Sequence, residues 1–302
     1  MIVTELYDGQ GLGNQLWCYV VTRIISEKNG YDFGVMGMNK FKGRDFMTID
    51  IGTEVIGGEG PEGGPPTTLP ETIDFYYKEK IERHPQSNID VTKFDNNLLD
   101  IKDNTKIDGT MQSYNYVKDY KEKIKTWIKV NDIEPYKKYS SDEICIIHIR
   151  GGDFKGSIAM LYSSYYNNCI NEVKKIKHNM LFYIVTDDVR TAKTILPNIP
   201  IIGSSSTNIN DKNKASHHIG GPINIDYYIL NNAKNVIMSA SSFGWWAVWT
   251  NNLNPKVIAP KYWAAHKEDS GYWSCGESLI SGWDYMGANG KLYSHEECKN
   301  EI

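Results

Sequence analysis

The sequence predicts an α/β protein made of two Rossmann-like lobes, each with a parallel sheet, and a cleft between the lobes. The chain has 302 residues, about twice the length of a typical domain. In its second half, short apolar runs alternate with helix-length segments, a pattern that suits parallel strands buried on both faces. The runs cover 144–149, 181–185, 236–238 and 257–259, and the helical segments roughly 163–177, 189–195, 226–233 and 244–251. Ligands of such sheets bind at the carboxyl ends of the strands.

The first half begins with a similar alternation. A strand is expected over residues 2–6, then a glycine-rich turn at 8–13, and a helix from about 14 to 28. Glycine and proline disfavour both helix and strand, so segment 57–70 is predicted to be an exposed loop.

The boundary between the lobes is predicted from a later change in pattern. A helical segment rich in Lys and Glu, 117–129, leads to Glu134-Pro135, which we interpret as a linker. The lobes are therefore expected to cover 1–138 and 139–302.

Composition argues against several classes of partner. Lys and Arg number 33 and Asp and Glu 37, a net charge of −4 that offers no overall attraction for nucleic acid or an anionic membrane. The five cysteines are widely spaced without a C-x-x-C pair, which indicates reduced thiols. No apolar stretch approaches the length of a membrane span, and the N-terminus lacks a signal-peptide pattern. We therefore expect a cytoplasmic protein with no integral membrane segment.

Aromatic residues make up 12% of the chain, with 20 Tyr and 8 Trp. Trp245, Trp246 and Trp249 share one predicted helix and are expected mainly to pack that helix against the sheet. Other rings gather near 114–116, 165–166 and 262–263, where flat rings with polar tips would suit a sugar.

Three turns after predicted strands carry candidate chemistry. The first, Gly9-Gln10-Gly11-Leu12-Gly13-Asn14-Gln15, precedes the first helix. Glycines permit positive φ and let backbone amides approach an anion, and a helix N-terminus adds about half a positive charge. The alternative is an ordinary turn, because the spacing does not match the dinucleotide fingerprint G-x-G-x-x-G.

The second turn is His148-Ile149-Arg150-Gly151-Gly152-Asp153, at the end of the most apolar strand. The guanidinium of Arg150 suits bidentate recognition of a phosphate, and the adjacent glycines would let a phosphate approach the main chain. In the alternative interpretation, Arg150 forms a salt bridge with Asp153 within the loop, and His148 is a hydrogen-bonded core residue.

The third turn, Ser239 to Trp246, follows the strand 236–238. Its hydroxyls could bind a phosphate together with helix amides, or could simply cap the helix.

The same turn is also compatible with the nucleophile of a serine hydrolase. Ala240-x-Ser242-x-Gly244 imitates a nucleophile elbow, and Asp269 or Asp284 followed by His295 would complete a triad in the required chain order. A hydrolase would leave the first two turns unexplained.

Two further pairs are weak metal candidates, Asp187-Asp188 and His217-His218. Neither has the additional spaced ligands that a metal site requires, and adjacent carboxylates after a strand are more typical of a helix N-cap. We expect no bound metal.

Together these motifs resemble glycosyltransferase family 11, the α-1,2-fucosyltransferases, and more distantly other fucosyltransferases with an H-x-R motif. The similar segments run in family order from residue 9 to 283 and leave out mainly residues 30–105. They are Gly11–Leu16 (similar to GGLGNQLFQ), Asp108–Tyr116 (G-x-x-Q-S-x-x-Y-F), His148–Asp153 (H-x-R-R-G-D), Phe182–Asp188 (F-x-x-F-S-D-D), Ser239–Trp249 (S-N-S-S-F-S-W-W-A-A-W), Lys256–Trp263 and Gly282-Trp283.

The resemblance implies a GT-B architecture, with the acceptor on the side of lobe 1–138 and a GDP-sugar donor held mainly by lobe 139–302. It implies inverting transfer of L-fucose from GDP-fucose to a hydroxyl of a glycan acceptor, expected to be the 2-OH of a galactose-type residue, with no metal or other cofactor. The residues it implies for donor binding are Gly11, Gly13, His148, Asp226, Ser241, Ser242 and Phe243, and those for catalysis are Arg150, Asp153 and Asn14.

The implied roles follow the charge that develops during transfer. Arg150 would grip the β-phosphate, because the departing diphosphate gains negative charge that a positioned cation stabilises. Asn14 would reach across the cleft to the diphosphate or sugar, while His148 and Asp226 would contact guanosine. Asp153 is the nearest motif carboxylate that could accept the proton of the acceptor hydroxyl, or it could only orient Arg150.

The sequence departs from the family at Gly151, where the motif has its second arginine. The loss of this cation leaves another GDP-deoxyhexose open as the donor. A non-catalytic protein that binds a nucleotide sugar or a glycan is the alternative function. Residues 30–105 match none of the family segments, so the sequence does not identify the acceptor.

Overall fold

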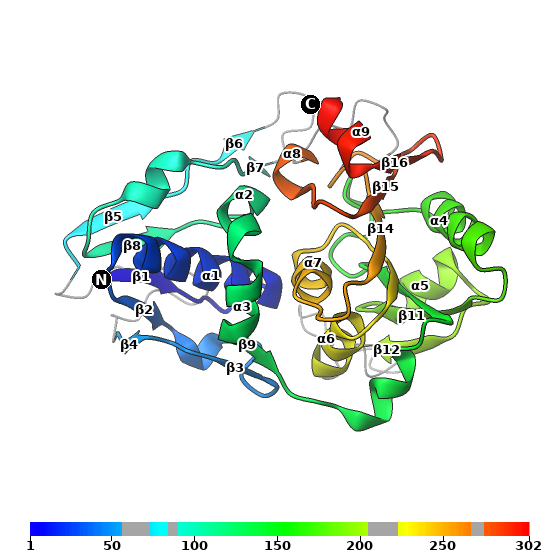
Figure 1. The fold of residues 1–302 in the computed structure, drawn as a ribbon, viewed down its shortest axis with the longest axis horizontal. Coiled ribbons are helices and arrows are strands. Elements are labelled where there is room, and N and C mark those ends of the chain that lie inside the picture. Colours follow the sequence, from blue (N-terminus) through cyan, green and yellow to red (C-terminus); the bar gives the residue numbers. More distant parts are fainter. Residues whose placement is uncertain (56–72, 84–89, 205–222, 267–274, 302) are drawn as a thin grey trace. The chain divides into compact units, whose positions relative to one another are not determined.

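A computed structural model describes residues 1–55, 73–83, 90–204, 223–266 and 275–301 (Figure 1). The described chain forms two compact units, Met1–Asn131 and Asp132–Ile302. This division falls seven residues before the boundary predicted from sequence, because the expected linker at Glu134-Pro135 is a 3₁₀ helix, η4 (Glu134–Tyr139), of the second unit. The predicted loop 57–70, the His217-His218 pair and Asp269 lie outside the described residues.

The first unit is built on a five-stranded parallel sheet with the order β4-β2-β1-β8-β5. Two small antiparallel pairs, β3 with β9 and β6 with β7, accompany it. The strands are β1 (Ile2–Glu5), β2 (Phe33–Met36), β3 (Met47–Ile49), β4 (Thr53–Glu54), β5 (Phe75–Lys78), β6 (Glu82–Arg83), β7 (Asp90–Val91), β8 (Thr105–Asp108) and β9 (Ile128–Val130). The helices are α1 (Leu12–Asn29), α2 (Tyr114–Val117) and α3 (Lys121–Trp127), with 3₁₀ turns η1 (Met38–Lys40), η2 (Asn96–Asp100) and η3 (Lys118–Tyr120).

The opening strand and helix are confirmed, whereas the single helix predicted over 117–129 is wrong. That segment forms the end of α2, η3 and α3, and then the strand β9, whose Ile128 pairs with Ile49 of β3. The Lys and Glu content that suggested one helix is compatible with short helical turns, and pairing with β3 makes the last two residues of the segment part of a strand.

The second unit contains a seven-stranded sheet with the order β12-β11-β10-β13-β14-β15-β16. Six strands are parallel, as predicted, and the edge strand β16 is antiparallel to β15. The strands are β10 (Ile144–Ile149), β11 (Leu181–Thr186), β12 (Ile201–Ser204), β13 (Asn235–Ile237), β14 (Lys256–Pro260), β15 (Asp284–Met286) and β16 (Leu292–Ser294). The helices are α4 (Ser163–Ile176), α5 (Val189–Ile195), α6 (Ile223–Asn231), α7 (Ser242–Trp249), α8 (Cys275–Ser278) and α9 (His295–Asn300).

The interior strand β10 organises the core of this unit. All six of its residues are buried, and successive side chains point to opposite faces. Cys145, Ile147 and Ile149 pack with residues of α4 and α5, while His148 lies against α7 on the other face. Figure 1 shows the corresponding layers, with helices on both sides of the strands. β10 therefore ends between two helical layers, and the residues after Ile149 emerge at the carboxyl edge of the sheet.

The tryptophan helix is packed as predicted. Trp245, Trp246 and Trp249 are each at most 2% exposed, and the rings of Trp245 and Trp249 stack with centroids 5.0 Å apart. Burial of such large rings anchors α7 and thereby fixes the turn that precedes it.

A buried ion pair crosses the sheet of the first unit. Lys106 of β8 is 1% exposed and Glu5 of β1 is 7% exposed, and their Nζ and Oε2 atoms are 2.6 Å apart. Burial raises the pKa of Glu5, and the contact with Lys106 opposes that shift. We predict that Lys106→Met lowers the free energy of unfolding by about 3 kcal/mol or more, because it leaves a buried carboxylate without its cation.

The double variant Glu5→Gln/Lys106→Met should lose less stability than Lys106→Met alone, since no uncompensated charge is then left inside. Urea unfolding of the single and double variants measures this coupling. Strictly additive losses would contradict it.

Candidate functional site

The turn after β10 places Arg150 between two carboxylates. Its NH2 atom lies 2.7 Å from Oδ1 of Asp153, and its NH1 atom lies 2.6 Å from Oδ2 of Asp187. Asp187 follows β11, and because Ile149 and Thr186 are partners in the β10–β11 register, the next residue of each strand meets at the sheet edge. The Arg150 side chain is one-third exposed. It is therefore held in a fixed orientation and still presents part of its surface to a ligand.

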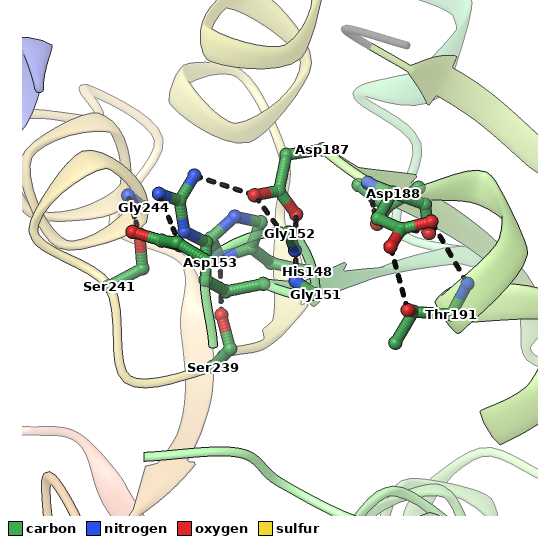
Figure 2. A network of polar contacts seen from close by, with 12 residues as sticks. His148, Gly151, Gly152, Asp153, Asp187, Asp188, Thr191, Ser239, Ser241 and Gly244 are labelled. Atoms are coloured by element: carbon green, nitrogen blue, oxygen red, sulfur yellow. Dashed lines mark hydrogen bonds and ion pairs between the residues drawn. The ribbon is translucent and has the colours of Figure 1, made fainter. Parts of the chain in front are cut away.

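The carboxylate of Asp187 also accepts hydrogen bonds from two backbone amides. Its Oδ1 accepts a hydrogen bond from the Gly151 N–H at 2.7 Å, and the Gly152 N–H lies 3.3 Å from each of its carboxylate oxygens (Figure 2). Successive backbone amides of this kind form concave sites for anions. The amides and the guanidinium that sequence analysis expected to bind a phosphate thus surround a carboxylate of the chain itself.

Gly151 fits closely against the start of α5. A Cβ atom at this position would lie 2.9 Å from Cβ of Thr191 and 3.1 Å from Cβ of Asp188. Asp188 caps α5, accepting hydrogen bonds from the Thr191 backbone N–H at 3.1 Å and its hydroxyl at 2.8 Å (Figure 2). The N-cap interpretation of the acidic pair thus holds for Asp188. The position where the family motif has a second arginine has no room for a side chain in this arrangement.

His148 is a buried, hydrogen-bonded residue. Its Nδ1 lies 3.0 Å from Oγ of Ser239, and its side chain is 4% exposed. Burial, with a smaller effect from the charge of Arg150, lowers the pKa of His148 to about 3. A Cβ atom on Gly244 would lie 2.6 Å from this Nδ1, so glycine is needed for α7 to pass the imidazole. His148 is therefore a hydrogen-bonded core residue, as the alternative interpretation expected. Its contact with guanosine stays a prediction.

The serines of the third turn begin α7. Ser241 is the N-cap residue, and its Oγ accepts a long hydrogen bond, 3.5 Å, from the Gly244 N–H. Ser242 is the first residue of the helix. The ring of Phe243 packs edge-on against Tyr227, with centroids 5.5 Å apart, and lies 6.2 Å from the ring of His148. Ser241 therefore caps the helix, and the proposed phosphate contacts of Ser241 and Ser242 stay predictions.

Asp226 lies in the first turn of α6 and is 4% exposed. A Cβ atom on Gly203 of β12 would lie 2.5 Å from its Oδ1. Asp226 is thus packed near β12, whereas His148 is packed under α7. The strand register aligns His148 with Val185 and Val185 with Gly203, so the two residues that the resemblance assigned to guanosine lie on the same face of the sheet.

The glycine-rich turn belongs to the first unit. Gly11 is the N-cap of α1 with φ −69° and ψ 157°, so it does not use the positive φ that glycine permits. A Cβ atom on Gly11 would meet nothing within 4 Å. Gly13 is buried in the first turn of α1, and Oδ1 of Asn14 accepts a hydrogen bond from Nε2 of Gln112 at 2.9 Å. The structure thus joins two motif segments, Gly11–Leu16 and Asp108–Tyr116, by a side-chain hydrogen bond.

The geometry does not support the hydrolase interpretation. Ser242 lies inside a helix, and the residues other than glycine with positive φ in the described ranges are Asn104, Met111, Asn254 and Ala265. A nucleophile elbow requires a strained residue at the turn.

Within the described residues, no three His, Cys, Asp or Glu side chains are grouped so that they could hold a metal ion. No helix in the described ranges has both the length and the apolar composition needed to span a membrane.

Sequence reasoning missed several residues at the two sheet edges. In the second unit, Asp187 was grouped with Asp188 as part of a cap, and its contact with Arg150 follows only from the pairing of β10 with β11. In the first unit, Tyr7 and Tyr76 both donate hydrogen bonds to Asp108. Tyr76 lies in the region without motifs, so no sequence signal marked it.

The comparisons with known proteins agree with these motifs. The model of the family "Glycosyl transferase family 11" matches residues 105–286. The chain belongs to glycosyltransferase family 11 and is a glycosyltransferase. Two α/β units, each built on a largely parallel sheet, are what the family resemblance implied.

Two curated relatives come from Escherichia coli. An "Alpha-1,2-colitosyltransferase" is 24% identical over 218 residues, covering 66% of this chain and 72% of the relative. The "O-antigen biosynthesis glycosyltransferase WbnK" is 25% identical over 155 residues, 46% of each protein.

Solved structures of the fucosyltransferase NodZ are also similar. One from Bradyrhizobium has a TM-score of 0.46 at 14% identity and covers 85% of this chain and 94% of NodZ. Another, described as NodZ α-1,6-fucosyltransferase co-crystallized with GDP, has a TM-score of 0.45 at 16% identity and covers 86% and 94% of the two chains.

The contact between Gly244 and His148 predicts a site-specific loss of stability. Gly244→Ala should lower the free energy of unfolding by about 1–3 kcal/mol, because the added methyl group meets a buried imidazole. Gly11→Ala is the matched control, since its methyl group enters open space and its φ is accessible to alanine; it should lose less, about 1 kcal/mol at most, from the weaker preference for alanine at an N-cap. Chemical unfolding of both variants makes the comparison. Equal losses would show that His148 does not constrain the turn.

The low pKa of His148 predicts a stability that falls in acid. An unfolded chain binds a proton at histidine near pH 6.5, whereas folded His148 stays neutral down to about pH 3. The free energy of unfolding therefore decreases as the pH falls from about 6.5, by up to about 1.4 kcal/mol per pH unit from this residue.

His266, whose pKa burial lowers to about 4, adds to the same slope. In His148→Gln the slope between pH 6 and pH 4 should be shallower, which urea unfolding at several pH values would measure. An unchanged slope would contradict a buried neutral imidazole.

Proposed function

We propose that the chain is an inverting glycosyltransferase that moves L-fucose from GDP-fucose to a hydroxyl of a galactose-type residue in a glycan acceptor, most simply the 2-OH. The observation that carries this proposal is Arg150, fixed between Asp153 and Asp187 at the carboxyl edge of the second sheet beside the amides of Gly151 and Gly152. Parallel α/β sheets bind ligands at this edge. The exposed part of the Arg150 side chain is suited to a diphosphate.

In this proposal Arg150 stabilises the departing GDP. Cleavage of the bond between the sugar and the β-phosphate places additional negative charge on the diphosphate, and a cation already in position lowers the barrier without reorganisation. Asp187 and Asp153 hold the guanidinium on both of its terminal nitrogens, so their role is orientation. Since Oδ1 of Asp153 is engaged by Arg150, we assign Asp153 to this role rather than to proton removal.

Neither a metal nor another cofactor is part of the proposal, because Arg150 supplies a positioned cation for the leaving group. Donor contacts by His148, Asp226, Ser241, Ser242, Phe243, Gly11 and Gly13, and a contact from Asn14 to the diphosphate or sugar, remain parts of the same proposal.

A second donor, another GDP-deoxyhexose, is favoured by one specific observation. The close contact of Gly151 with Thr191 leaves no place for the second arginine of the family motif, so the donor loop carries one guanidinium. The relative at 24% identity is named as a colitosyltransferase. A donor sugar with fewer hydroxyls would require fewer polar contacts from this loop.

Substitution of Arg150 tests the proposed function. Mass spectrometry would follow transfer from GDP-fucose, and from GDP-colitose in parallel, to a panel of β-galactosides. Arg150→Ala should lower kcat by roughly 10²–10³-fold, as expected for removal of one positioned donor to the leaving group. Arg150→Lys should recover only part, because an ammonium lacks the bidentate fork.

The matched control is Arg190→Ala, which removes an exposed arginine from α5 in the same unit. It should keep turnover and the thermal stabilisation by GDP, whereas Arg150→Ala should weaken both. Undiminished turnover of Arg150→Ala would contradict the proposal. Binding of GDP-fucose without transfer to any acceptor would instead indicate a binding protein.

A further inference from the structure

A second polar site lies where the strand order of the first sheet changes direction. From β1 the chain passes to β2 and β4 on one side, and it returns through β5 to β8 on the other side, so β1 and β8 are neighbours although far apart in sequence. In doubly wound sheets this is where a ligand crevice forms, at the carboxyl ends of the strands. Asp108 ends β8, and Tyr7 follows β1 by two residues.

Asp108 is held by two phenol groups. The Tyr7 hydroxyl donates to its Oδ1 at 3.1 Å, and the Tyr76 hydroxyl donates to its Oδ2 at 2.6 Å. Burial raises the pKa of Tyr76 to about 12 and that of Tyr7 further, with the charge of Asp108 acting in the same direction. Both phenols therefore stay protonated and remain donors. Each carboxylate oxygen keeps a lone pair that can accept another hydrogen bond.

The nearest buried cation is already engaged. Lys106 precedes Asp108 by two residues on the same face of β8, and its Nζ pairs with Glu5 at 2.6 Å. Within the described residues, the contacts that Asp108 makes are hydrogen bonds from hydroxyls and not an ion pair. The negative charge of Asp108 therefore remains available to a ligand that donates hydrogen bonds.

The loop after Asp108 is held in a fixed conformation. Oε2 of Glu79 accepts hydrogen bonds from the Thr110 N–H at 2.6 Å, its hydroxyl at 3.1 Å and the Met111 N–H at 3.1 Å. Met111 has a φ of 50°, which is uncommon outside glycine. Glu79 is only 5% exposed, and among the described residues its Oε1 atom has no hydrogen-bond partner. Strain and an unsatisfied buried oxygen together are typical of a site arranged for a ligand.

We propose that Asp108, oriented by Tyr7 and Tyr76, binds hydroxyl groups of the acceptor sugar. This inference rests on the proposed function and adds to it the residues that hold the acceptor. A carboxylate repels a diphosphate but accepts hydrogen bonds from hydroxyls. Tyr76 is 47% exposed as a residue, so it also offers part of a flat apolar ring beside the carboxylate, a combination that suits a pyranose.

Two neighbouring tyrosines provide a matched pair of variants. Tyr76 and Tyr77 are consecutive residues of β5, and each donates its hydroxyl to an aspartate, Tyr76 to Asp108 and Tyr77 to Asp95 at 2.8 Å. Tyr76→Phe and Tyr77→Phe therefore remove the same group and the same kind of hydrogen bond on one strand. Only the first acts on the proposed acceptor site.

The test measures KM for the galactoside and for the GDP-sugar separately. Asp108→Asn should raise the galactoside KM about 10-fold or more, because it replaces a charged acceptor of hydrogen bonds with a neutral amide. Tyr76→Phe should raise it several-fold, and Tyr77→Phe should change it less than twofold. In all three variants the KM of the GDP-sugar and the thermal stabilisation by GDP should stay within twofold of wild type.

Monodeoxy galactosides identify the hydroxyl and exclude a merely structural effect. The wild-type protein should bind the analogue that lacks the hydroxyl bound by Asp108 more weakly than the parent galactoside. Asp108→Asn should bind this analogue and the parent galactoside with similar affinity. Equal discrimination by the two proteins would overturn the proposal. An unchanged galactoside KM in Asp108→Asn, or an equal effect of Tyr77→Phe, would do the same.

Direct binding separates this inference from the proposed function. Titration calorimetry with methyl β-galactoside in the absence of donor should show weaker binding to Asp108→Asn than to wild type. If wild type transfers no sugar but still binds the galactoside through Asp108, the proposed function fails and the binding site stands. If binding is the same in both proteins, the site is overturned whatever the turnover.

Discussion

The carboxylate of Asp187 is the contact on which the candidate donor site depends. It links the end of β11 to the turn after β10 by accepting hydrogen bonds from two backbone amides and pairing with Arg150. Without this carboxylate, a glycine pair would leave the turn free to adopt many conformations. Arg150 would then have only its neighbour Asp153 to orient it. The fixed guanidinium is thus a consequence of strand pairing and not of the turn alone.

The two sheet edges carry different polar groups. The edge of the second sheet presents a guanidinium held between two carboxylates, whereas the edge of the first sheet presents Asp108 with two phenol groups. A transferase must bind an anionic leaving group and an uncharged alcohol, and these two chemistries call for different partners. The mild net charge of −4 is compatible with this division, because each edge acts through local groups.

Sequence patterns predicted the elements whose signals are local. A run of six residues that are all apolar except His148 indicated β10, and the capped helical pattern after Asp188 indicated α5 with its observed bounds. Patterns failed at β9, which pairs with the distant strand β3, and at β16, a three-residue strand of a hairpin that is too short for a periodic signal. The four-residue strand β12 has too few residues for a periodic signal and contains Gly203.

In the candidate site, too, local contacts could be predicted and contacts between distant residues could not. Arg150 and Asp153 are three residues apart, so their salt bridge could be anticipated from sequence as an alternative. The contact of Arg150 with Asp187 and that of Asp108 with Tyr76 join residues about 30 or more positions apart. They depend on strand order, which local sequence does not encode. The lack of space at Gly151 likewise arises from α5, which packs against it in three dimensions.

A crystal structure of the protein with GDP tests the central claim most directly. The account predicts that the β-phosphate lies within hydrogen-bond distance of the Arg150 guanidinium, at the edge where β10 and β11 end. GDP bound elsewhere in the second unit, with Arg150 remote from both phosphates, would contradict it.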